Sequence, residues 1–496
     1  MTDSSDMTPL ERRRVLKGLG TGLAAGLAGC SGGGGGDGGG GDGGGGGDGG
    51  GGDGGGGGGD GGSGTPAPQD LDFWLFGGIP AEREYISGHY DEYTKHNVKY
   101  SHQEWGQKYQ IIASAAANNN LPHVMSGQGQ QIPSYVQAGA LQPLSQDEYM
   151  DRLEAANELF IDANLQTLTF EGLGDTSGEQ QWALPGGYAD MAPFIDIRTD
   201  YLEQTSYDRP PRNWDELIQV AKEMQELDEV SAAVTASGTD FGLTAGYFIG
   251  FVYANGGRYF DPETLEVTVD EPGFIDAVGV YERIAKNGLF PDAVVENNHI
   301  DAGRLLREGE SGIFITFSHA NAVYQTLDAE QSWLNGEGHV VTRAPLPDSP
   351  SGQFEPQTLL LQNAQAFMMG GSASGAERDA AFDYIEWWNT EEQLAPWTYR
   401  EESDVGIRGR VPTLKSAFEN PSELFRGQFG DLLKLYENDN LFNQSSRFPS
   451  FTGIASIQSE LNTKVLQPVM LGNKTAEQAC KDAAPAMQDI VDENLK

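Results

Sequence analysis

The residues that could perform catalysis do not form a recognised catalytic pattern. The chain has no His-Glu-x-x-His sequence, and its one Gly-x-Ser-x-Gly match, residues 29–33, opens the glycine-rich stretch and not a strand-to-helix turn. Its 7 histidines are scattered, and its 2 cysteines cannot form a metal cluster. A pair of carboxylates, as a glycoside hydrolase uses, stays open because the chain has 73 acidic residues. We therefore expect no metal and no cofactor.

Three side chains follow predicted strands at positions that suit ligand contacts. Phe76 ends an apolar strand over residues 71–76, and Gln128 and Gln131 follow a strand over residues 122–125. In an open α/β sheet, the loops that leave the carboxyl ends of the strands line the ligand crevice. The glycine-glutamine stretch lacks a Lys-Ser/Thr pair, so a phosphate-binding loop is a weak interpretation. The alternative for each of the three is a solvated loop residue.

Strand and helix patterns alternate along the chain, which predicts an α/β fold. The order of elements over residues 71–125 favours an open parallel sheet covered by helices. Asn213 and Glu216 have the spacing of a capping box, and residues 312–317 form an apolar run typical of a buried strand. Helices are also predicted over residues 81–96, 107–119, 244–255, 273–287, 301–309, 375–390, 424–436, 452–471 and 476–491.

Composition separates an N-terminal segment from the rest of the chain. Residues 31–64 contain 27 of the 68 glycines and otherwise only five aspartates and two serines, which predicts disorder. The rest of the chain has more residues than one hydrophobic core usually accommodates, so we expect two lobes. A net charge of −42 argues against nucleic acid as a partner. Because molar salt shortens the screening length to about 3 Å, this acidity indicates adaptation to very salty water, as in an extreme halophile.

The N-terminus has the features of an export signal. Arg12 and Arg13, followed by an apolar pair and Lys17, fit the twin-arginine pattern. Residues 18–29 are apolar but too short to span a bilayer. The sequence up to Cys30 is similar to a lipobox, whose cysteine receives a lipid. We predict a signal over residues 1–29, a lipid-anchored linker over residues 30–69 that reaches roughly 30–40 Å, and a folded part over residues 70–496.

Six sequence segments are similar to motifs of one known family, and they occur in the same order along the chain. They are residues 121–124 with 138–144, then 182–185, 209–217, 254–261, 306–314 and 409–414. The chain resembles the extracellular solute-binding proteins of ABC importers, specifically the family 1 group that includes maltose-binding protein. His123 replaces the usual aspartate and Asn213 the usual threonine.

The resemblance implies a periplasmic-binding-protein-like fold of type II, with two α/β lobes of interleaved chain segments joined by a hinge. The expected crossings lie near residues 183–187, 315–318 and 365–370. The lobe boundaries that follow are approximate: residues 70–185 and 317–367 for lobe 1, and residues 188–315 and 370–496 for lobe 2.

The resemblance also implies site residues. Tyr188 and Asp190 follow the first crossing, and Phe317 and His319 end the strand at the second. Sugar recognition needs flat apolar faces and a few directed polar groups. The other candidates by position are Trp74, Tyr247 and Arg408. For each residue the alternative is core packing or a surface position.

Taken together, these features predict a lipid-anchored receptor on the extracellular face of the membrane. It would bind a small solute, expected to be a sugar or oligosaccharide, in an interlobe cleft and deliver it to the permease of an ABC transporter. We expect a monomer that touches the membrane only through Cys30. The open alternatives are a secreted carbohydrate-active enzyme and a surface adhesive or structural protein. Asn443 and Asn473 also fit the glycosylation pattern.

Overall fold

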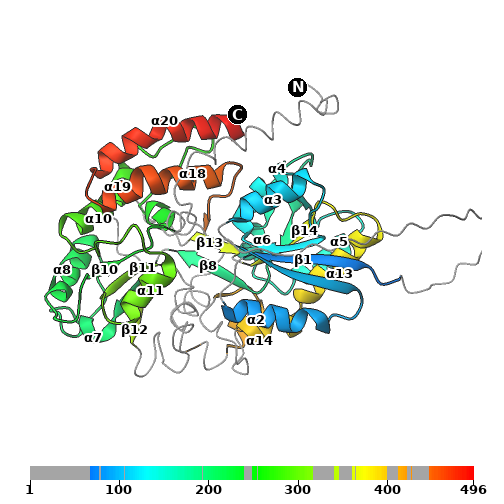
Figure 1. The fold of residues 1–496 in the computed structure, drawn as a ribbon, viewed down its shortest axis with the longest axis horizontal. Helices are drawn as coiled ribbons and strands as arrows, with labels where there is room; N and C mark the ends of the chain where they lie inside the picture. The colour runs from blue at the N-terminus through cyan, green and yellow to red at the C-terminus, as the bar shows by residue number, and fades with distance from the viewer. Residues whose placement is uncertain are drawn as a thin grey trace, which may run out of the picture. The chain divides into compact units, whose positions relative to one another are not determined.

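Figure 1 shows the computed structural model of the chain. It describes residues 67–76, 80–104, 107–192, 194–239, 248–253, 255–316, 340–345, 360–363, 365–398, 411–421, 426 and 446–495. The predicted export signal, Cys30, the glycine-rich linker to residue 66, Asn443 and most of the predicted helix over residues 424–436 lie outside these ranges. In the described ranges, none of the helices combines the length and apolar character needed to cross a bilayer.

The first sheet is mixed, with one reversed strand. Its order is β2 (Asn97–Gln103), β1 (Asp70–Phe76), β3 (Val124–Gly127), β14 (Ala366–Gly370) and β4 (Leu141–Gln142), with β7 (Ala183–Leu184) also paired to β14. β1 is parallel to β2 and β3, as the sequence predicts. β14 is antiparallel to β3, β4 and β7, so the sheet is mixed, and the predicted parallel arrangement holds for the strands over residues 70–127. β14 comes from a distant segment and is not part of a β-α-β unit.

Helices cover both faces of the first sheet (Figure 1). Leu71, Phe73 and Leu75 face α2 (Pro80–His89) and α13 (Ala376–Trp388). The alternate residues of β1 face α3 (Lys108–Ala117) and α4 (Ile132–Gln137). α2 is shorter than the predicted helix over residues 81–96: it ends at His89 and a 3-10 turn follows over Tyr90–Glu92. The chain must become extended there because β2 pairs with β1 from Asn97 onward.

The second sheet has its own hydrophobic core. Its order is β10 (Val234–Thr235), β11 (Ile313–Thr316), β9 (Phe194–Arg198) and β12 (Val341–Pro345), and only the β10–β11 pair is parallel. One face packs against α8 (Trp214–Gln225), α10 (Pro272–Lys286), α18 (Ile454–Glu460), α19 (Gln467–Met470) and α20 (Ala476–Leu495). α11 (His299–Arg307) covers the other face. A π-helix, Leu461–Leu466, joins α18 to α19.

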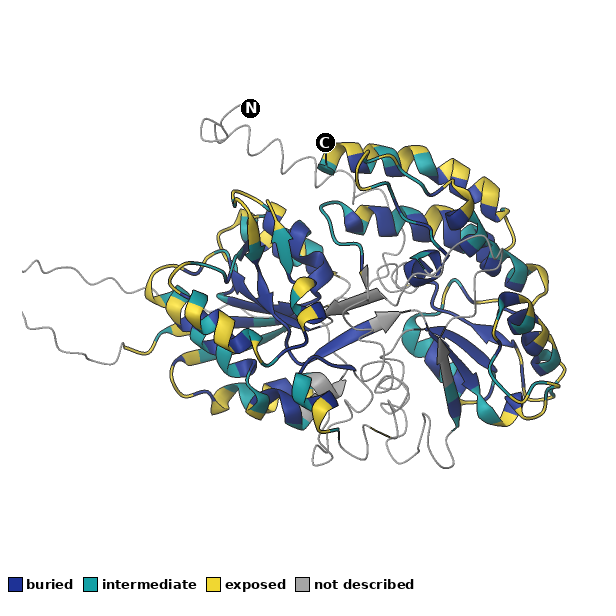
Figure 2. Ribbon diagram, turned by 180° about the vertical axis from the view of Figure 1, so that it is seen from behind, coloured by how far each residue is buried: buried dark blue, intermediate teal, exposed yellow. Residues whose placement is uncertain are grey.

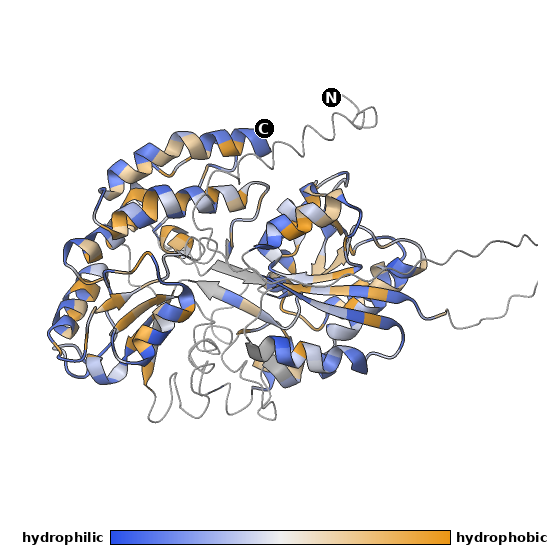
Figure 3. Cartoon of the chain, in the orientation of Figure 1, coloured by the Kyte–Doolittle hydropathy of each residue, from blue (hydrophilic) through white to orange (hydrophobic). Residues whose placement is uncertain are grey.

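Burial follows the amphipathic pattern of these elements. In Figure 2 the strands are largely buried and the outward sides of the helices are exposed, and in Figure 3 the helices carry hydrophilic and hydrophobic stretches side by side. On α20 the buried residues recur at helical spacing, among them Ala476, Cys480, Ala483 and Met487. Periodicity therefore predicted this helix well.

The helix caps differ in detail from the prediction. Asn213 Oδ1 accepts a hydrogen bond from the Glu216 backbone N–H (2.8 Å), as expected. The Glu216 carboxylate, however, accepts from the Arg212 backbone N–H and from the Arg209 guanidinium instead of returning to Asn213. A complete capping box forms at α11, between Asn298 and Asp301.

A third sheet contains strands that lie next to two of the expected crossings, residues 183–187 and 365–370. Its order is β15 (Val411–Pro412), β8 (Tyr188–Ala192), β13 (Leu360–Asn363) and β16 (Ser446–Arg447). The remaining named elements are β5 (Thr169–Glu171), β6 (Glu179–Gln181), α5 (Met150–Asn157), α6 (Asp162–Gln166), α7 (Thr199–Leu202), α14 (Glu391–Thr398) and α15 (Lys415–Glu419).

The two cores divide the chain differently from the boundaries expected from the sequence. The cores on the first sheet draw on residues 71–194 and 366–418, and the core on the second sheet draws on residues 195–315 and 448–491. The sequence assigns all of residues 370–496 to the second lobe, whereas α13 and Phe418 pack on the first sheet. The chain re-enters the first sheet through β14, and described residues on α13, on α14 and over residues 411–418 pack in its core.

Candidate ligand-binding site

β1 and β3 end beside each other at one edge of the first sheet. Leu75 pairs with Ser126, and Phe76 Cβ lies 3.8 Å from the position that a Cβ would take on Gly127. The rings of Trp74 and Phe76 lie on the same face, with centroids 6.3 Å apart. Phe76 is 1% exposed, whereas Trp74 is only partly buried. Trp74 is therefore the more accessible of these two predicted contacts.

A turn of three glutamines follows β3 at this edge. Gln128, Gln130 and Gln131 are all buried, and Gly129–Gln131 form a 3-10 turn. Tyr109 donates a hydrogen bond to Gln131 Oε1, and Gln130 Nε2 donates to Gln128 Oε1 (3.2 Å). In the described part of the chain, Gln130 Oε1 has no hydrogen-bond partner. We call residues 128–131 the glutamine turn, and its buried amides can hydrogen-bond a polar ligand.

A chain of side-chain hydrogen bonds joins the end of β3 to β8. Tyr188 donates from its hydroxyl to Gln365 Oε1 (3.3 Å), and Gln365 Nε2 donates to Ser126 Oγ (2.5 Å). All three residues are buried. Gln365 immediately precedes β14, so its side chain links the start of this strand to β3 and to β8. Its role was missed because no local motif marks it.

The first crossing turns tightly against Gln365. Gly186 has a φ of +65°, and a Cβ on it would lie 1.6 Å from the Gln365 carbonyl oxygen. Its backbone N–H donates to Asn389 Oδ1 at the end of α13 (2.8 Å). Only glycine satisfies both the positive φ and this close approach.

Tyr188 and Asp190 lie two residues apart on β8, so they project to the same face of the strand. Each is 2% exposed. Asp190 pairs across the third sheet with Gln362, and Tyr188 pairs with Pro412. The structure thus places these two predicted contacts together on a crossing strand, with the Tyr188 hydroxyl already hydrogen-bonded to Gln365.

A segment packed on the second core also touches the glutamine turn. Ser450 Oγ donates to the Gln130 backbone oxygen (2.8 Å). The neighbouring Phe451 packs edge-on against Phe260, with ring centroids 4.9 Å apart. Ser450 and Gln130 are 320 positions apart, so sequence reasoning had no signal for this contact.

The second sheet ends in small polar residues. Thr235 on β10 and Thr316 on β11 terminate parallel neighbouring strands and are buried. The Thr235 hydroxyl has no hydrogen-bond partner in the described ranges. These residues were also missed, although polar ends of parallel strands are a usable signal. The predicted contacts Tyr247, Phe317, His319 and Arg408 lie outside the described residues.

The tyrosines near the glutamine turn stay protonated. Burial raises the pKa of Tyr109 and of Tyr135 well above the usual value, and Tyr135 raises that of Tyr109 further. Both hydroxyls therefore remain hydrogen-bond donors at physiological pH. Among the described residues, no group of three or more His, Cys, Asp or Glu side chains is close enough to hold a metal ion. The described site thus offers hydrogen bonds and aromatic faces.

Solved structures share this fold. MalE3 of T. maritima, solved with maltose bound, has a TM-score of 0.66 and 18% identity, covering 85% of this chain and 99% of that chain. The GacH receptor of Streptomyces glaucescens, solved unliganded and with acarbose, has a TM-score of 0.67 and 15% identity, covering 86% and 100%. A solute-binding protein of Thermotoga lettingae bound with α-D-tagatose has a TM-score of 0.67 and 18% identity, covering 85% and 100%. The expected periplasmic-binding-protein fold is confirmed.

A family model described as bacterial extracellular solute-binding protein matches residues 78–395. The match begins after β1 and includes the glutamine turn, Gly186, Gln365 and most of α14. This family comprises receptors that bind solutes without converting them, which confirms the expectation that the chain is not an enzyme. The chain belongs to the bacterial extracellular solute-binding proteins.

Proposed function

We propose that this protein is a lipid-anchored receptor that captures a sugar or oligosaccharide and delivers it to the permease of an ABC importer. The observation that carries the sugar assignment is the set of neutral hydrogen-bonding groups at the edge of the first sheet. The glutamine turn, Tyr109 and Tyr188 supply amides and hydroxyls, and Trp74 supplies a partly exposed aromatic face. Sugar hydroxyls and sugar C–H faces match these two kinds of group.

The ligand would bind between two lobes, each built around one of the two cores. In this proposal one lobe comprises residues 70–192 and 366–418, and the other comprises residues 194–316 and 448–495. Strands β8 and β13 and the Gly186 turn connect them. A ligand that touches both lobes would shift the population toward a closed form, which the permease would recognise.

The wider contact set is part of the same proposal. It consists of Trp74, Phe76, Gln128, Gln131, Tyr188 and Asp190, with Tyr247, Phe317, His319 and Arg408 from segments outside the described residues. The neighbours support a carbohydrate ligand, since their solved complexes hold maltose, acarbose and tagatose. At 15–18% identity, they support it by fold alone.

The receptor would remain outside the cell through its N-terminus. The twin arginines Arg12 and Arg13 would direct export, and Cys30 would carry the lipid. The glycine-rich linker would let the folded part move near the membrane. The net charge of −42 suits a very salty medium, where screening relieves the repulsion among surface carboxylates.

A thermal-shift screen of the purified full chain in molar salt tests the proposal. Maltose, longer malto-oligosaccharides, tagatose and a polyol would be compared with a peptide mixture. A ligand at about 100 times its dissociation constant should stabilise the folded state by about 2.7 kcal/mol. A rise in melting temperature with peptides and with no sugar or polyol would contradict the sugar assignment.

A further inference from the structure

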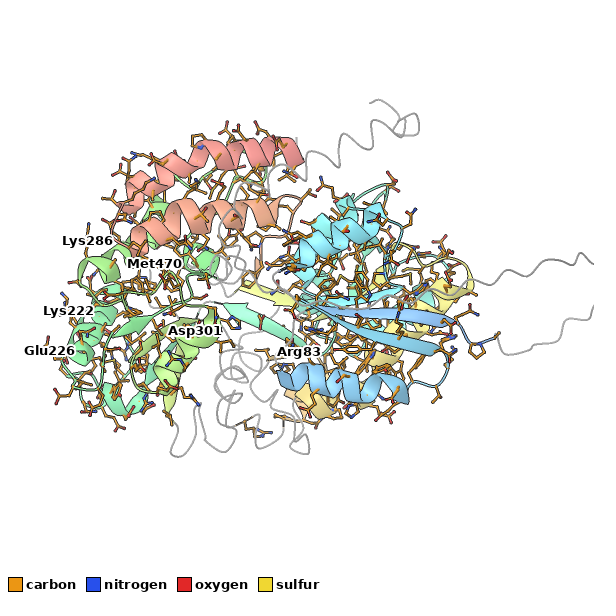
Figure 4. All side chains as sticks on the ribbon, viewed as in Figure 1. Arg83, Lys222, Glu226, Lys286, Asp301 and Met470 are labelled. Atoms are coloured by element: carbon orange, nitrogen blue, oxygen red, sulfur yellow. The ribbon has the colours of Figure 1, made fainter. Side chains whose placement is uncertain are left out.

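The turn between α19 and α20 presents one of the two N-glycosylation patterns of the chain. Asn473, Lys474 and Thr475 form the pattern, and the turn covers residues 471–475. Figure 1 shows this turn at the end of the second core that lies away from the first sheet, and Met470, labelled in Figure 4, directly precedes it. A group attached there would leave the candidate ligand-binding site clear.

The Asn473 side chain is accessible and unpaired. Asn473 is exposed, and its carboxamide has no hydrogen-bond partner in the described part of the chain. Its backbone N–H donates to the Pro468 carbonyl oxygen (2.8 Å), which fixes the turn. Asn118 and Asn287 are also exposed after helices, but each donates from Nδ2 to a carbonyl oxygen of its own helix (2.7 Å). The amide nitrogen of Asn473 is therefore available, whereas theirs are engaged.

The other two residues of the pattern leave Asn473 clear. Lys474 Nζ pairs with Asp482 Oδ2 on α20 (2.8 Å), so its side chain is held against that helix. Thr475 is exposed, and its Oγ1 accepts a hydrogen bond from the Gln478 backbone N–H (3.2 Å) as a cap of α20. The Thr475 hydroxyl can still donate its own proton to an incoming group. The pattern is thus presented on a fixed and exposed turn.

We propose that Asn473 is an N-glycosylation site of the folded protein. The sugar donor would be an oligosaccharide carried on a polyprenyl phosphate lipid. Asn473 Nδ2 would form a bond to the anomeric carbon and lose a proton, while the bond from that carbon to the phosphate oxygen breaks and the lipid phosphate leaves with the electron pair. The attached glycan would lie next to Leu471, which is the one exposed large apolar side chain among the described residues.

The export route determines which asparagines can be modified. The twin-arginine route carries folded chains, so a pattern must be exposed in the folded state to be modified outside the cell. Asn473 meets this requirement because it is exposed on the surface of the second core. The inference therefore rests on the location given in the proposed function.

Mass spectrometry of tryptic peptides tests the inference on the full chain, purified from its natural host. The peptide over residues 465–474, or 465–481 where a glycan hinders cleavage after Lys474, should carry an added mass of whole sugar units on Asn473. The internal control is the peptide over residues 416–426, because Asn420 and Ser422 have the same spacing with proline between them, which the pattern excludes. An Asn473 without sugar overturns the inference.

Substitutions of Thr475 show whether the pattern directs the modification. Thr475→Ala keeps Asn473 but removes the hydroxyl, so the sugar should be lost, whereas Thr475→Ser keeps the hydroxyl and should retain sugar. Asn287→Gln, at an exposed asparagine outside any such pattern, is the control and should also retain it. Sugar on Asn473 in the Thr475→Ala chain contradicts the inference. The peptide from the unaltered chain decides the matter if Thr475→Ala does not fold.

Fractionation of the same cells separates this inference from the proposed function. A chain found outside the cell with an unmodified Asn473 overturns the inference alone. A chain found inside the cell contradicts the proposed location. With Arg12 and Arg13 both replaced by lysine, the chain should stay inside and lack the sugar, and sugar on that chain would contradict modification outside the cell.

Discussion

The carbonyl oxygen of Gln365 occupies the space that a side chain on Gly186 would need. A Cβ on Gly186 would lie 1.6 Å from that oxygen, and the Gly186 φ of +65° already disfavours any other residue. Gly186 follows β7 and Gln365 precedes β14, so this close backbone contact fixes the ends of two paired strands against each other.

Gly186→Ala should destabilise the protein by at least about 2 kcal/mol, the sum of the cost of a positive φ and of overpacking. Gly172→Ala is the matched control, because Gly172 has the same φ of +65° but nothing within 4 Å of its would-be Cβ. Gly172→Ala should cost about 1 kcal/mol. Urea unfolding of both variants measures the difference, and equal losses would show that the Gln365 contact contributes nothing.

Because Tyr188 and Gln365 share a hydrogen bond, substitutions of these two residues should have non-additive effects on the free energy of unfolding. Tyr188→Phe should cost about 0.5–1.5 kcal/mol, and Gln365→Leu about 1–3 kcal/mol because it also removes the donor to Ser126 Oγ. In a double-mutant cycle, the two losses should sum to more than the loss in the double variant, by about 0.5–1.5 kcal/mol.

The control for this cycle is Tyr259→Phe. The Tyr259 hydroxyl is buried and has no hydrogen-bond partner in the described ranges, so its removal should be neutral or stabilising. If urea unfolding shows that the losses of stability in Tyr188→Phe and Gln365→Leu are additive, this hydrogen bond does not stabilise the contact between β8 and the start of β14.

The part of the fold that depends on local pattern is predictable from the sequence. β1, α3 and α20 were predicted to within a few residues, because periodicity and turn residues are local signals. The reversed strand β14 was not predicted as such, since strand direction depends on pairing with β3 across more than two hundred positions. Helix ends also shifted where a neighbouring strand required extended chain, as after His89.

The candidate site likewise contains some residues that a local sequence pattern predicts and others that no local pattern marks. Gln128 and Gln131 were named as candidate contacts because they follow a strand, and the loops at the carboxyl ends of strands line the crevice of an open α/β sheet. Their contact with a ligand stays a prediction. Gln365 and Ser450 were missed because their partners, Ser126 and the backbone of Gln130, are hundreds of positions away.

Glu216 should make stability depend on acid pH. The Arg209 guanidinium and the Arg212 backbone N–H lower the pKa of Glu216 from 4.5 to about 2. A pKa that is lower in the folded state gives stability that is complete above pH 4.5 and is lost as pH falls toward 2. Between pH 5 and pH 3, Glu216→Gln should therefore lose less stability than the unaltered chain.

Glu226→Gln provides the comparison for Glu216. Glu226 is exposed at the end of the same helix (Figure 4). Urea unfolding at several pH values should give parallel curves for Glu226→Gln and the unaltered chain. If Glu216→Gln also ran parallel to them, the Arg209 pair would have no effect on acid stability.

Cys480 should be unreactive in the folded protein. It is fully buried, and burial, with a smaller effect of Asp270, raises the pKa of its thiol from 9.0 to about 12. A rise of three pKa units lowers the thiolate fraction at pH 8 about 1000-fold, and the thiolate is the reactive species. In a Cys30→Ser chain, which leaves Cys480 as the single cysteine, a thiol reagent should label only after denaturant is added. Fast labelling under native conditions would contradict the burial of Cys480.

The lipid at Cys30 should be what keeps the protein on the cell. Cys30→Ser should release the exported chain into the medium with its ligand affinity unchanged, because the proposed lipid anchor would be lost. Replacing Arg12 and Arg13 together by lysine should instead retain the chain inside the cell, since the twin-arginine pair would be lost. Ser31→Ala, next to the lipobox cysteine, is the control and should stay on the membrane. Fractionation followed by immunoblotting distinguishes the three locations, and a Cys30→Ser chain that remained with the membrane would point to a different means of attachment.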